Sequence, residues 1–164
     1  LSLRAGIADG RGLVAALALG ADGVQCGTVF LASTESFAHD YHKQRLIAAK
    51  AGDTVHTDLF AINWPPNSPV RVLRNSVTDA AETLWGHHPD TLPRVVIGDE
   101  EGRALYKYGT DSPLRSTTGD FEQMALYAGE GAALVSAVRP AAGIIATMMQ
   151  EAERTIAALH TALA

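Results

Sequence analysis

The sequence predicts an α/β fold, namely the C-terminal part of a (β/α)₈ TIM barrel with an inserted small α/β lid domain. Residues 1–27 have the pattern of two buried strands joined by an amphipathic helix, and such a βαβ unit requires a parallel sheet. Both strands end in small residues, at Ala5-Gly6 and at Gly27-Thr28. The chain has 164 residues, whereas a complete barrel needs about 250, so we expect the earlier strands to lie outside it.

The helix of this unit has recognisable ends. Asp9 is expected to cap it by accepting N–H groups of the first turn, and Gly20 stands where a left-handed C-terminal cap is needed. Between them, apolar residues recur at spacings of three and four, namely Leu13, Val14, Leu17 and Ala18. The second strand is predicted at residues 22–27. Residues 1–33 therefore form the predicted barrel segment.

Residues 34–118 differ in character and are interpreted as a lid or substrate lobe inserted before the last barrel helices. The lobe is expected to contain a helix and two strands, at residues 37–51, 54–62 and 69–74. Three prolines between positions 65 and 69 predict an exposed loop, because proline fits neither a helix interior nor a central strand. The segments 76–86 and 91–109 carry only weak helical signals. Loops of this size at a barrel rim commonly cover an active site.

Residues 119–164 are expected to supply the final barrel helices. The pattern becomes helical from Gly119 on and includes the segment 121–131. A second helix is predicted to open at Pro140, a favoured first-turn residue, and to continue to about Leu163. Its expected apolar side comprises Ile144 or Ile145, Met148, Ala152, Ile156, Leu159 and Leu163.

Composition excludes several classes of protein. The formal net charge is −5 and there is no basic run, which disfavours nucleic-acid binding. No apolar run approaches the roughly 18 residues of a membrane span. The lone cysteine, Cys26, excludes an internal disulfide and favours a reducing, cytoplasmic location. The start at Leu1 without an initiator methionine suggests a fragment or a processed piece.

The two small-residue turns are the strongest functional signal. Carboxyl ends of adjacent parallel strands meet at one rim, where Ala5, Gly6 and Gly27 would let backbone N–H groups approach a phosphate. Thr28 would add a hydroxyl donor. The alternative is that both glycines belong to ordinary βα turns. The glycine spacing in residues 6–12 matches neither a dinucleotide fingerprint nor a P-loop.

Other candidate residues carry weaker signals. His39 and His42 are three apart on a predicted helix, but no third ligand converges with them, so no metal site is predicted. Cys26 is interpreted as a small apolar filler of a buried strand rather than as a nucleophile. Tyr127 and Gly129 either line a flat cofactor or form a packed aromatic before a glycine-rich turn.

The run AGIADGRGLVAALALGADGVQCGTVFLASTES, residues 5–36, resembles the nitronate monooxygenase family, formerly called 2-nitropropane dioxygenases. That family has a strand ending in Gly-Gly, an IADGRG helix and a strand ending in GT-x-FLAT-x-ES. VLRN at 72–75 is similar to its A-R-x-x-R-N segment. YAGEGA at 127–132, with Pro140-Ala141, is similar to its AGQG-x-G…PA-x-E-I close.

The resemblance implies an FMN-dependent oxidoreductase that oxidises alkyl nitronates, or a similar small carbanion substrate, with O₂. The predicted FMN-binding residues are Ala5, Gly6, Cys26, Gly27, Thr28, Tyr127 and Gly129. No catalytic residue is assigned, because the family's catalytic histidine precedes the strand that ends at Ala5. That histidine is expected in the N-terminal half of the parent polypeptide, and this half is therefore a required partner of the chain. The chain alone is expected to be catalytically silent. The alternatives are a related NAD(P)H-dependent quinone or enoyl reductase and a flavin-free truncated scaffold.

Three positions depart from the family pattern. Ala5 replaces the first glycine of its turn, and Cys26 stands where methionine is common. Glu130 stands where glutamine is usual, which would place a negative charge near the flavin.

Arg71 and Arg74 either reach an anion or are solvated charges at a strand edge, and the second interpretation is favoured.

Overall fold

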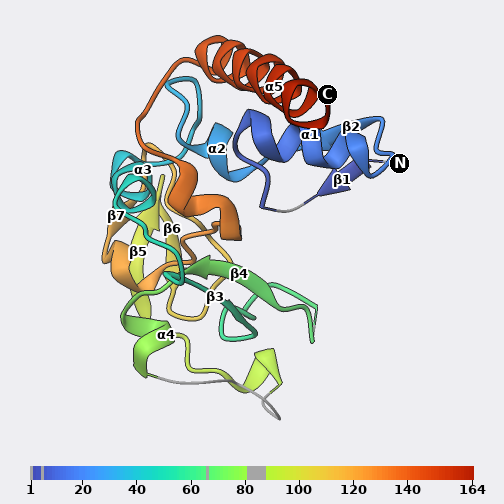
Figure 1. Ribbon diagram of the computed structural model, residues 1–164. Coiled ribbons are helices and arrows are strands. Elements are labelled where there is room, and N and C mark those ends of the chain that lie inside the picture. Colours follow the sequence, from blue (N-terminus) through green and yellow to red (C-terminus); the bar gives the residue numbers. More distant parts are fainter. Residues whose placement is uncertain (1, 5, 66, 81–87) are drawn as a thin grey trace.

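Figure 1 shows the computed structural model, which describes residues 2–4, 6–65, 67–80 and 88–164. Within those ranges the chain forms strands and helices in an α/β arrangement. In chain order they are β1 (Ser2–Arg4), α1 (Gly10–Ala18), β2 (Gly23–Gln25), α2 (Thr28–Leu31), α3 (Asp40–Ile47), β3 (Thr54–Thr57), β4 (Val70–Leu73), α4 (Ser76–Ala80), the 3₁₀ turn η1 (Pro89–Thr91), β5 (Val96–Glu100), β6 (Arg103–Tyr106), β7 (Thr118–Gly119), the 3₁₀ turns η2 (Phe121–Gln123) and η3 (Glu130–Leu134), and α5 (Ala141–Leu163).

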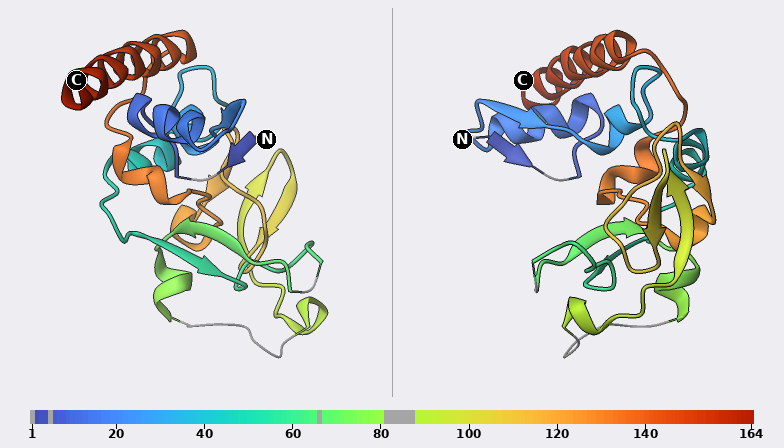
Figure 2. Two further views of the ribbon diagram at one scale, coloured as in Figure 1. Left: turned by 45° about the vertical axis from the view of Figure 1, so that its right-hand side comes forward. Right: turned by 180° about the vertical axis from the view of Figure 1, so that it is seen from behind.

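The elements gather at two ends of the molecule. The long helix α5 lies across α1 at one end, beside β1 and β2, and both chain termini are found there (Figures 1 and 2). Strands β3 and β4 and helix α4 lie at the other end, with the β5–β7 sheet and α3 between (Figure 1). None of the helices in the described ranges combines the length and the apolar character needed to cross a membrane.

The predicted βαβ unit is confirmed. Strands β1 and β2 pair in parallel, with Leu3 opposite Val24. Asp9 caps α1 by accepting the N–H of Gly12 at 2.8 Å, and Gly20 follows the helix with a φ of 85°. Helix α2 was not anticipated; it begins directly after β2 and carries Thr28 as its first residue.

Two antiparallel sheets follow the βαβ unit. Both strands predicted here form, although β3 ends at Thr57 and not at Ile62, and they pair with each other. Strand β5 pairs with both β6 and β7. The weak helical prediction for 91–109 is therefore wrong, because β5 and β6 form a hairpin there. Its turn places Glu101 and Gly102 at positive φ, 53° and 86°, which suits the twist of a tight hairpin.

Two further boundaries differ from the prediction. Helix α3 begins only at Asp40, because the imidazole of His39 caps it by accepting the N–H of Tyr41 at 3.0 Å. The helical prediction for 121–131 is wrong, since only the short turns η2 and η3 occur there. The residues between these turns run beside β4, where Leu73 donates its N–H to the carbonyl of Leu126 at 2.8 Å.

Two clusters of buried residues form the core of the part of the chain that the structure describes. The larger cluster joins α2, α3, β4, the segment after β7 and α5, and it consists of Val29, Ala32, Leu46, Leu73, Leu126, Ala128, Ala132, Val135 and Ile144. The smaller cluster lies around β4 and α4 and consists of Leu59, Phe60, Val72, Val77 and Ala125. Strand β4 contributes to both clusters, so it connects the two ends of the molecule.

Candidate functional site

The predicted site residues of the described part of the chain line two adjoining pockets beyond β2. The first, here called the glycine pocket, has a volume of about 90 Å³ and is lined by Gly6, Ile7, Ala8, Gln25, Cys26, Gly27, Thr28, Gly129 and Gly131. The second, the Arg71 pocket, has a volume of about 330 Å³ and is lined by Gly27, Thr28, Leu31, Arg71, Tyr127, Ala128 and Gly129. The pockets share three residues. Ala5, also predicted for the site, lies outside the described residues.

Close backbone approach shapes the glycine pocket. A side chain at Gly131 would place its Cβ 2.8 Å from the carbonyl oxygen of Gly6, a distance that real structures do not tolerate. A Cβ at Gly129 would lie 3.2 Å from the hydroxyl oxygen of Thr28. Gly6 itself has a φ of 70°, in the left-handed region that favours glycine. The pocket thus joins the end of β1, the end of β2 and the turn η3.

Gly27 has no such internal constraint. Its φ of −101° and ψ of −58° are ordinary for any residue, and a Cβ there would meet no atom within 4 Å. The missing side chain therefore leaves open space at the wall of both pockets. As first residues of a helix, Thr28 and Val29 have N–H groups without an intrahelical partner. This combination of space and free donors suits a ligand that approaches the backbone closely.

Thr28 is the hydroxyl residue of the glycine pocket. Its oxygen accepts the N–H of Gly129 at 2.8 Å. Because a hydroxyl carries both acceptor lone pairs and one proton, this bond leaves the proton free to be donated to an anion. The hydrogen bond also fixes the η3 turn against the end of β2.

Cys26 lines the glycine pocket but is not prepared for nucleophilic chemistry. Burial raises the pKa of its thiol, which keeps it protonated at neutral pH. The half-buried side chain packs against the larger core cluster. The interpretation of Cys26 as an apolar filler agrees with these surroundings.

His42, on α3, serves the fold. His42 is fully buried, and its Nε2 lies 3.1 Å from the carbonyl oxygen of Tyr127 while its Nδ1 lies 3.2 Å from the hydroxyl oxygen of Ser112. Desolvation lowers the pKa of His42 to about 4, against the opposing hydrogen bond to Tyr127. The neutral ring therefore donates to Tyr127 and accepts from Ser112. In the described ranges no group of three or more His, Cys, Asp or Glu side chains converges as a metal site would require.

Both the backbone carbonyl and the side-chain hydroxyl of Tyr127 are hydrogen-bonded. Its carbonyl receives the His42 contact, and its hydroxyl donates to the carbonyl of Thr110 at 2.8 Å. Burial raises the pKa of the Tyr127 phenol, so the phenol stays protonated. With both ends fixed, Tyr127 forms a rigid wall of the Arg71 pocket.

The sequence left two interpretations of Arg71 open, contact with an anion and a solvated charge at a strand edge, and favoured the second. Its side chain, expected to be a solvated charge, lines the second pocket and contacts Glu130 at 3.0 Å and the hydroxyl of Thr54 at 3.2 Å. The negative charge expected at Glu130 is thus paired with a guanidinium. The sequence signal for Arg71 was its position immediately before VLRN, the run that resembles the family's A-R-x-x-R-N segment.

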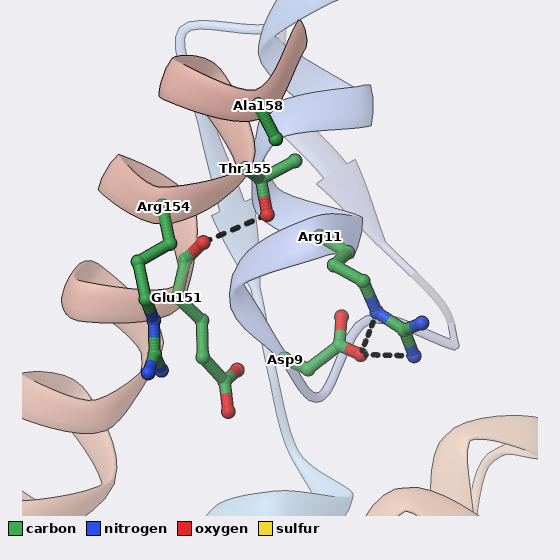
Figure 3. A pocket seen from close by; sticks show the side chains of 6 residues that line it. All are labelled: Asp9, Arg11, Glu151, Arg154, Thr155 and Ala158. Atoms are coloured by element: carbon green, nitrogen blue, oxygen red, sulfur yellow. Dashed lines mark hydrogen bonds and ion pairs between the residues drawn. The ribbon is translucent and has the colours of Figure 1, made fainter.

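Another pocket, of about 390 Å³, lies between α1 and α5 (Figure 3). Its acidic side chains have structural partners: Asp9 accepts from Gly12 and pairs with Arg11, and Glu151 accepts the N–H of Gly10 at 3.0 Å. These contacts fix the start of α1 against the middle of α5. No predicted site residue lines this pocket.

A polar pocket of about 410 Å³ lies at the start of α3 and is lined by Thr34, His39, Asp40, Lys43 and Arg115. Its cations hold the preceding loop. Lys43 donates to the carbonyl of Ser36 at 3.1 Å, and one guanidinium nitrogen of Arg115 contacts the carbonyls of residues 34–36. We therefore take the glycine pocket and the Arg71 pocket together as the candidate site.

Residues 4–151 match the family described as nitronate monooxygenase. The chain belongs to the nitronate monooxygenase family. Nitronate monooxygenase of Paraburkholderia phytofirmans is 32% identical over 155 residues, which are 94% of this chain and 38% of that protein. A probable nitronate monooxygenase of Staphylococcus saprophyticus is 37% identical over 102 residues, 62% of this chain and 26% of that protein. The resemblance inferred from the sequence is confirmed, and the chain spans well under half the length of these relatives.

Solved structures of similar proteins show the same α/β fold. FabK from Thermotoga maritima matches this nitronate monooxygenase family member with a TM-score of 0.71 and 30% identity, covering 98% of this chain and 46% of FabK. Nitroalkane oxidase from Streptomyces ansochromogenes matches with a TM-score of 0.69 and 29% identity, covering 96% of this chain and 40% of that protein. The names of the monooxygenases and the oxidase denote oxidoreductases.

Proposed function

We propose that the chain is the FMN-phosphate-binding part of an oxidoreductase that oxidises alkyl nitronates with O₂. The observation that carries the proposal is the glycine pocket, in which Gly6, Gly27, Thr28 and Gly129 converge from three segments. Family membership supports the same activity. In this proposal the chain forms the C-terminal part of a (β/α)₈ barrel, residues 34–118 act as its lid or substrate lobe, and the rest of the barrel comes from the N-terminal half of the parent polypeptide.

The glycine pocket fits a phosphate group. Its volume of about 90 Å³ lies far below the roughly 300–1,000 Å³ of pockets that hold whole ligands, so it suits only the end of a cofactor. The open position at Gly27 lets that end reach the backbone. The N–H groups at the start of α2 and the Thr28 hydroxyl supply donors, which are what phosphate oxygens require.

In the mechanism that we propose, FMN supplies the redox chemistry when bound. The residues of this chain bind and orient it: the backbone at Gly6 and Gly27 and the hydroxyl of Thr28 hold the phosphate. Tyr127, fixed by Thr110 and His42, keeps the neighbouring wall in place. The proton-abstracting base is expected outside this chain, so no described residue is given that role.

The test is a titration of the 164-residue chain with FMN, followed by flavin fluorescence, with riboflavin as the matched ligand that lacks the phosphate. We expect FMN to bind more tightly than riboflavin. Gly27→Val should weaken FMN binding by at least about tenfold, a loss of about 1.4 kcal/mol, because its side chain fills the approach to the backbone. Gly23→Val is the control, since Gly23 begins β2, four residues before Gly27, has open space for a side chain and lines neither pocket.

The outcomes separate the proposal from its alternatives. If Gly27→Val binds FMN as well as the unmodified chain does, the phosphate assignment is wrong. If the purified full-length parent carries no flavin and is colourless, the flavin-free scaffold is the better description. Activity assays of the full-length parent with nitronates, and with NAD(P)H plus a quinone or an enoyl substrate, then distinguish nitronate oxidation from a related NAD(P)H-dependent quinone or enoyl reductase.

A further inference from the structure

The Arg71 pocket differs in chemistry from the glycine pocket beside it. Its volume of about 330 Å³ is at the lower end of the range for small-ligand sites, roughly 300–1,000 Å³. Apart from Thr28 and the glycine backbone, its lining consists of Leu31, Tyr127 and Ala128 with one charged residue, Arg71. The hydroxyl of Tyr127 is already bonded to Thr110, so that ring offers mainly apolar surface.

Arg71 is held in place before any ligand arrives. It stands on β4 next to Val72, which is fully buried, and opposite His56 on β3. One guanidinium nitrogen donates to the hydroxyl of Thr54 at 3.2 Å. About a third of the side chain is exposed, at 32%. A guanidinium positioned in this way loses little conformational freedom when it binds an anion.

The partner of Arg71 is readily displaced. Glu130 contacts the second guanidinium nitrogen at 3.0 Å, but its side chain is 71% exposed and it does not line the pocket. An ion pair this exposed contributes little to stability. An anionic ligand inside the pocket would therefore exchange with Glu130 at small cost, and Glu130 acts as a competitor for the same guanidinium.

We propose that the Arg71 pocket binds a small ligand with an apolar body and one planar anionic group, and that Arg71 selects the anion. Carboxylates and nitronates share this chemistry, because both spread one negative charge over two oxygens that match the two-pronged guanidinium. The proposal rests on the proposed function in one respect: it assigns the anionic substrate of that oxidoreductase to this pocket. Glu130 sets the affinity by competing with the substrate.

The test compares benzoate with benzamide, its neutral counterpart of equal shape, by isothermal titration of the full chain. We expect benzoate to bind about tenfold more tightly than benzamide, the effect of one charge-assisted hydrogen-bonded contact. Arg71→Gln should remove that preference and leave benzamide binding unchanged. Glu130→Gln should tighten benzoate binding severalfold without affecting benzamide, because the competing carboxylate is gone.

Arg74→Gln is the matched control, since Arg74 is an exposed arginine just beyond β4 that lines neither pocket. It should behave as the unmodified chain does. Equal binding of benzoate and benzamide by the unmodified chain, or a benzoate preference that survives Arg71→Gln, overturns the proposal. So does unchanged benzoate affinity in Glu130→Gln, because the exchange of counter-ions is then absent.

FMN titrations of the same variants distinguish this proposal from the proposed function. Arg71→Gln should change FMN affinity by less than about twofold, because the phosphate contacts lie in the glycine pocket. A large loss of FMN binding in Arg71→Gln assigns the guanidinium to the cofactor and overturns the substrate site. If FMN does not bind at all while the benzoate preference depends on Arg71, the proposed function fails and the anion site stands.

Discussion

At the scale of single residues, the burial of His42 makes the stability of the fold depend on pH. Its pKa is about 4 in the folded chain, against an ordinary value of 6.5, because the ring is desolvated. The unfolded chain therefore binds the proton more readily, and the free energy of unfolding falls as the pH drops from 6.5 to 4. The loss approaches about 3 kcal/mol at the lower pH. Above pH 6.5 this contribution is constant.

Urea unfolding at a series of pH values checks this prediction. His42→Gln should flatten the dependence between pH 6.5 and 4, while its amide can still donate to the carbonyl of Tyr127. His160→Gln is the control, because His160 is exposed near the end of α5, and it should leave the dependence unchanged. A steep dependence that persists in His42→Gln would show that another group is responsible.

Among the elements, the crossing of α1 and α5 depends on Gly10. A Cβ at this position would lie 2.4 Å from both the N of Ala152 and the carbonyl oxygen of Met148. Gly10→Ala should therefore destabilise the chain by about 1–3 kcal/mol, the usual cost of overpacking. Gly143→Ala on α5 has open space and should instead stabilise by about 0.5–1 kcal/mol through helix propensity. Thermal unfolding measures both, and shifts of the same sign would contradict the prediction.

The proline-rich connection between β3 and β4 begins with buried, hydrogen-bonded backbone and continues into an exposed segment. Ala61 and Ile62 both donate to the carbonyl of Tyr108 at 2.9 Å, and Ile62 is fully buried. Pro65 and Pro69 are exposed, as the sequence predicted, while Pro66 lies outside the described residues. Hydrogen exchange should therefore be slow at residues 61–62 and fast at Asn67 and Ser68. Equal protection on both sides of Asn63 would count against this boundary.

How far the sequence predicts each element depends on where its stabilising contacts come from. The βαβ unit was predictable because its determinants are local: Asp9 caps the helix and Gly20 ends it. The segment 121–131 was not predictable in the same way. Its extended backbone depends on pairing with β4, which lies about fifty positions earlier in the chain, as in the bridge between Val72 and Tyr127. No local pattern carries that information.

The residues of the candidate site likewise fall into those that strand order predicts and those that depend on contacts between distant segments. Gly6, Gly27 and Thr28 follow strand ends, so topology alone predicted that they meet. The sequence offered Arg71 as a residue that could reach an anion, but its place in the pocket and its pairing with Glu130 depend on the fold that brings β4 beside η3. The role of His42 was equally hidden, since an isolated histidine on a helix gives no sign of its buried partners.

For the molecule as a whole, the exposed apolar side chains of α5 are expected to affect behaviour in solution. The helix buries Ile144, Met148 and Ala152 of its predicted apolar side, whereas three other members of that side are exposed: Ile156 55%, Leu159 49% and Leu163 87%. Two further apolar residues of the helix are also exposed, Ile145 at 53% and Met149 at 49%. Exposed apolar side chains gathered on one helix promote association. The chain alone should therefore self-associate with increasing concentration.

Sedimentation velocity checks this expectation. The double variant Ile156→Lys with Leu159→Glu should shift the chain toward monomer, because it places charges on the apolar surface. Glu153→Lys changes the polar side of the same helix and should have no comparable effect. A chain that stays monomeric over the full concentration range would show that this surface does not mediate contacts between copies.

The hydrogen bond between Thr28 and Gly129 also has a kinetic consequence. The two residues are 101 positions apart, so the glycine pocket forms only when a loop of that length has been closed. Contacts of such long sequence separation form slowly, because the entropy of loop closure is lost before they stabilise the fold. During synthesis the first wall of the pocket emerges long before the second. The chain should therefore acquire ligand binding as one of its last folding events, and a ligand bound there should chiefly slow unfolding.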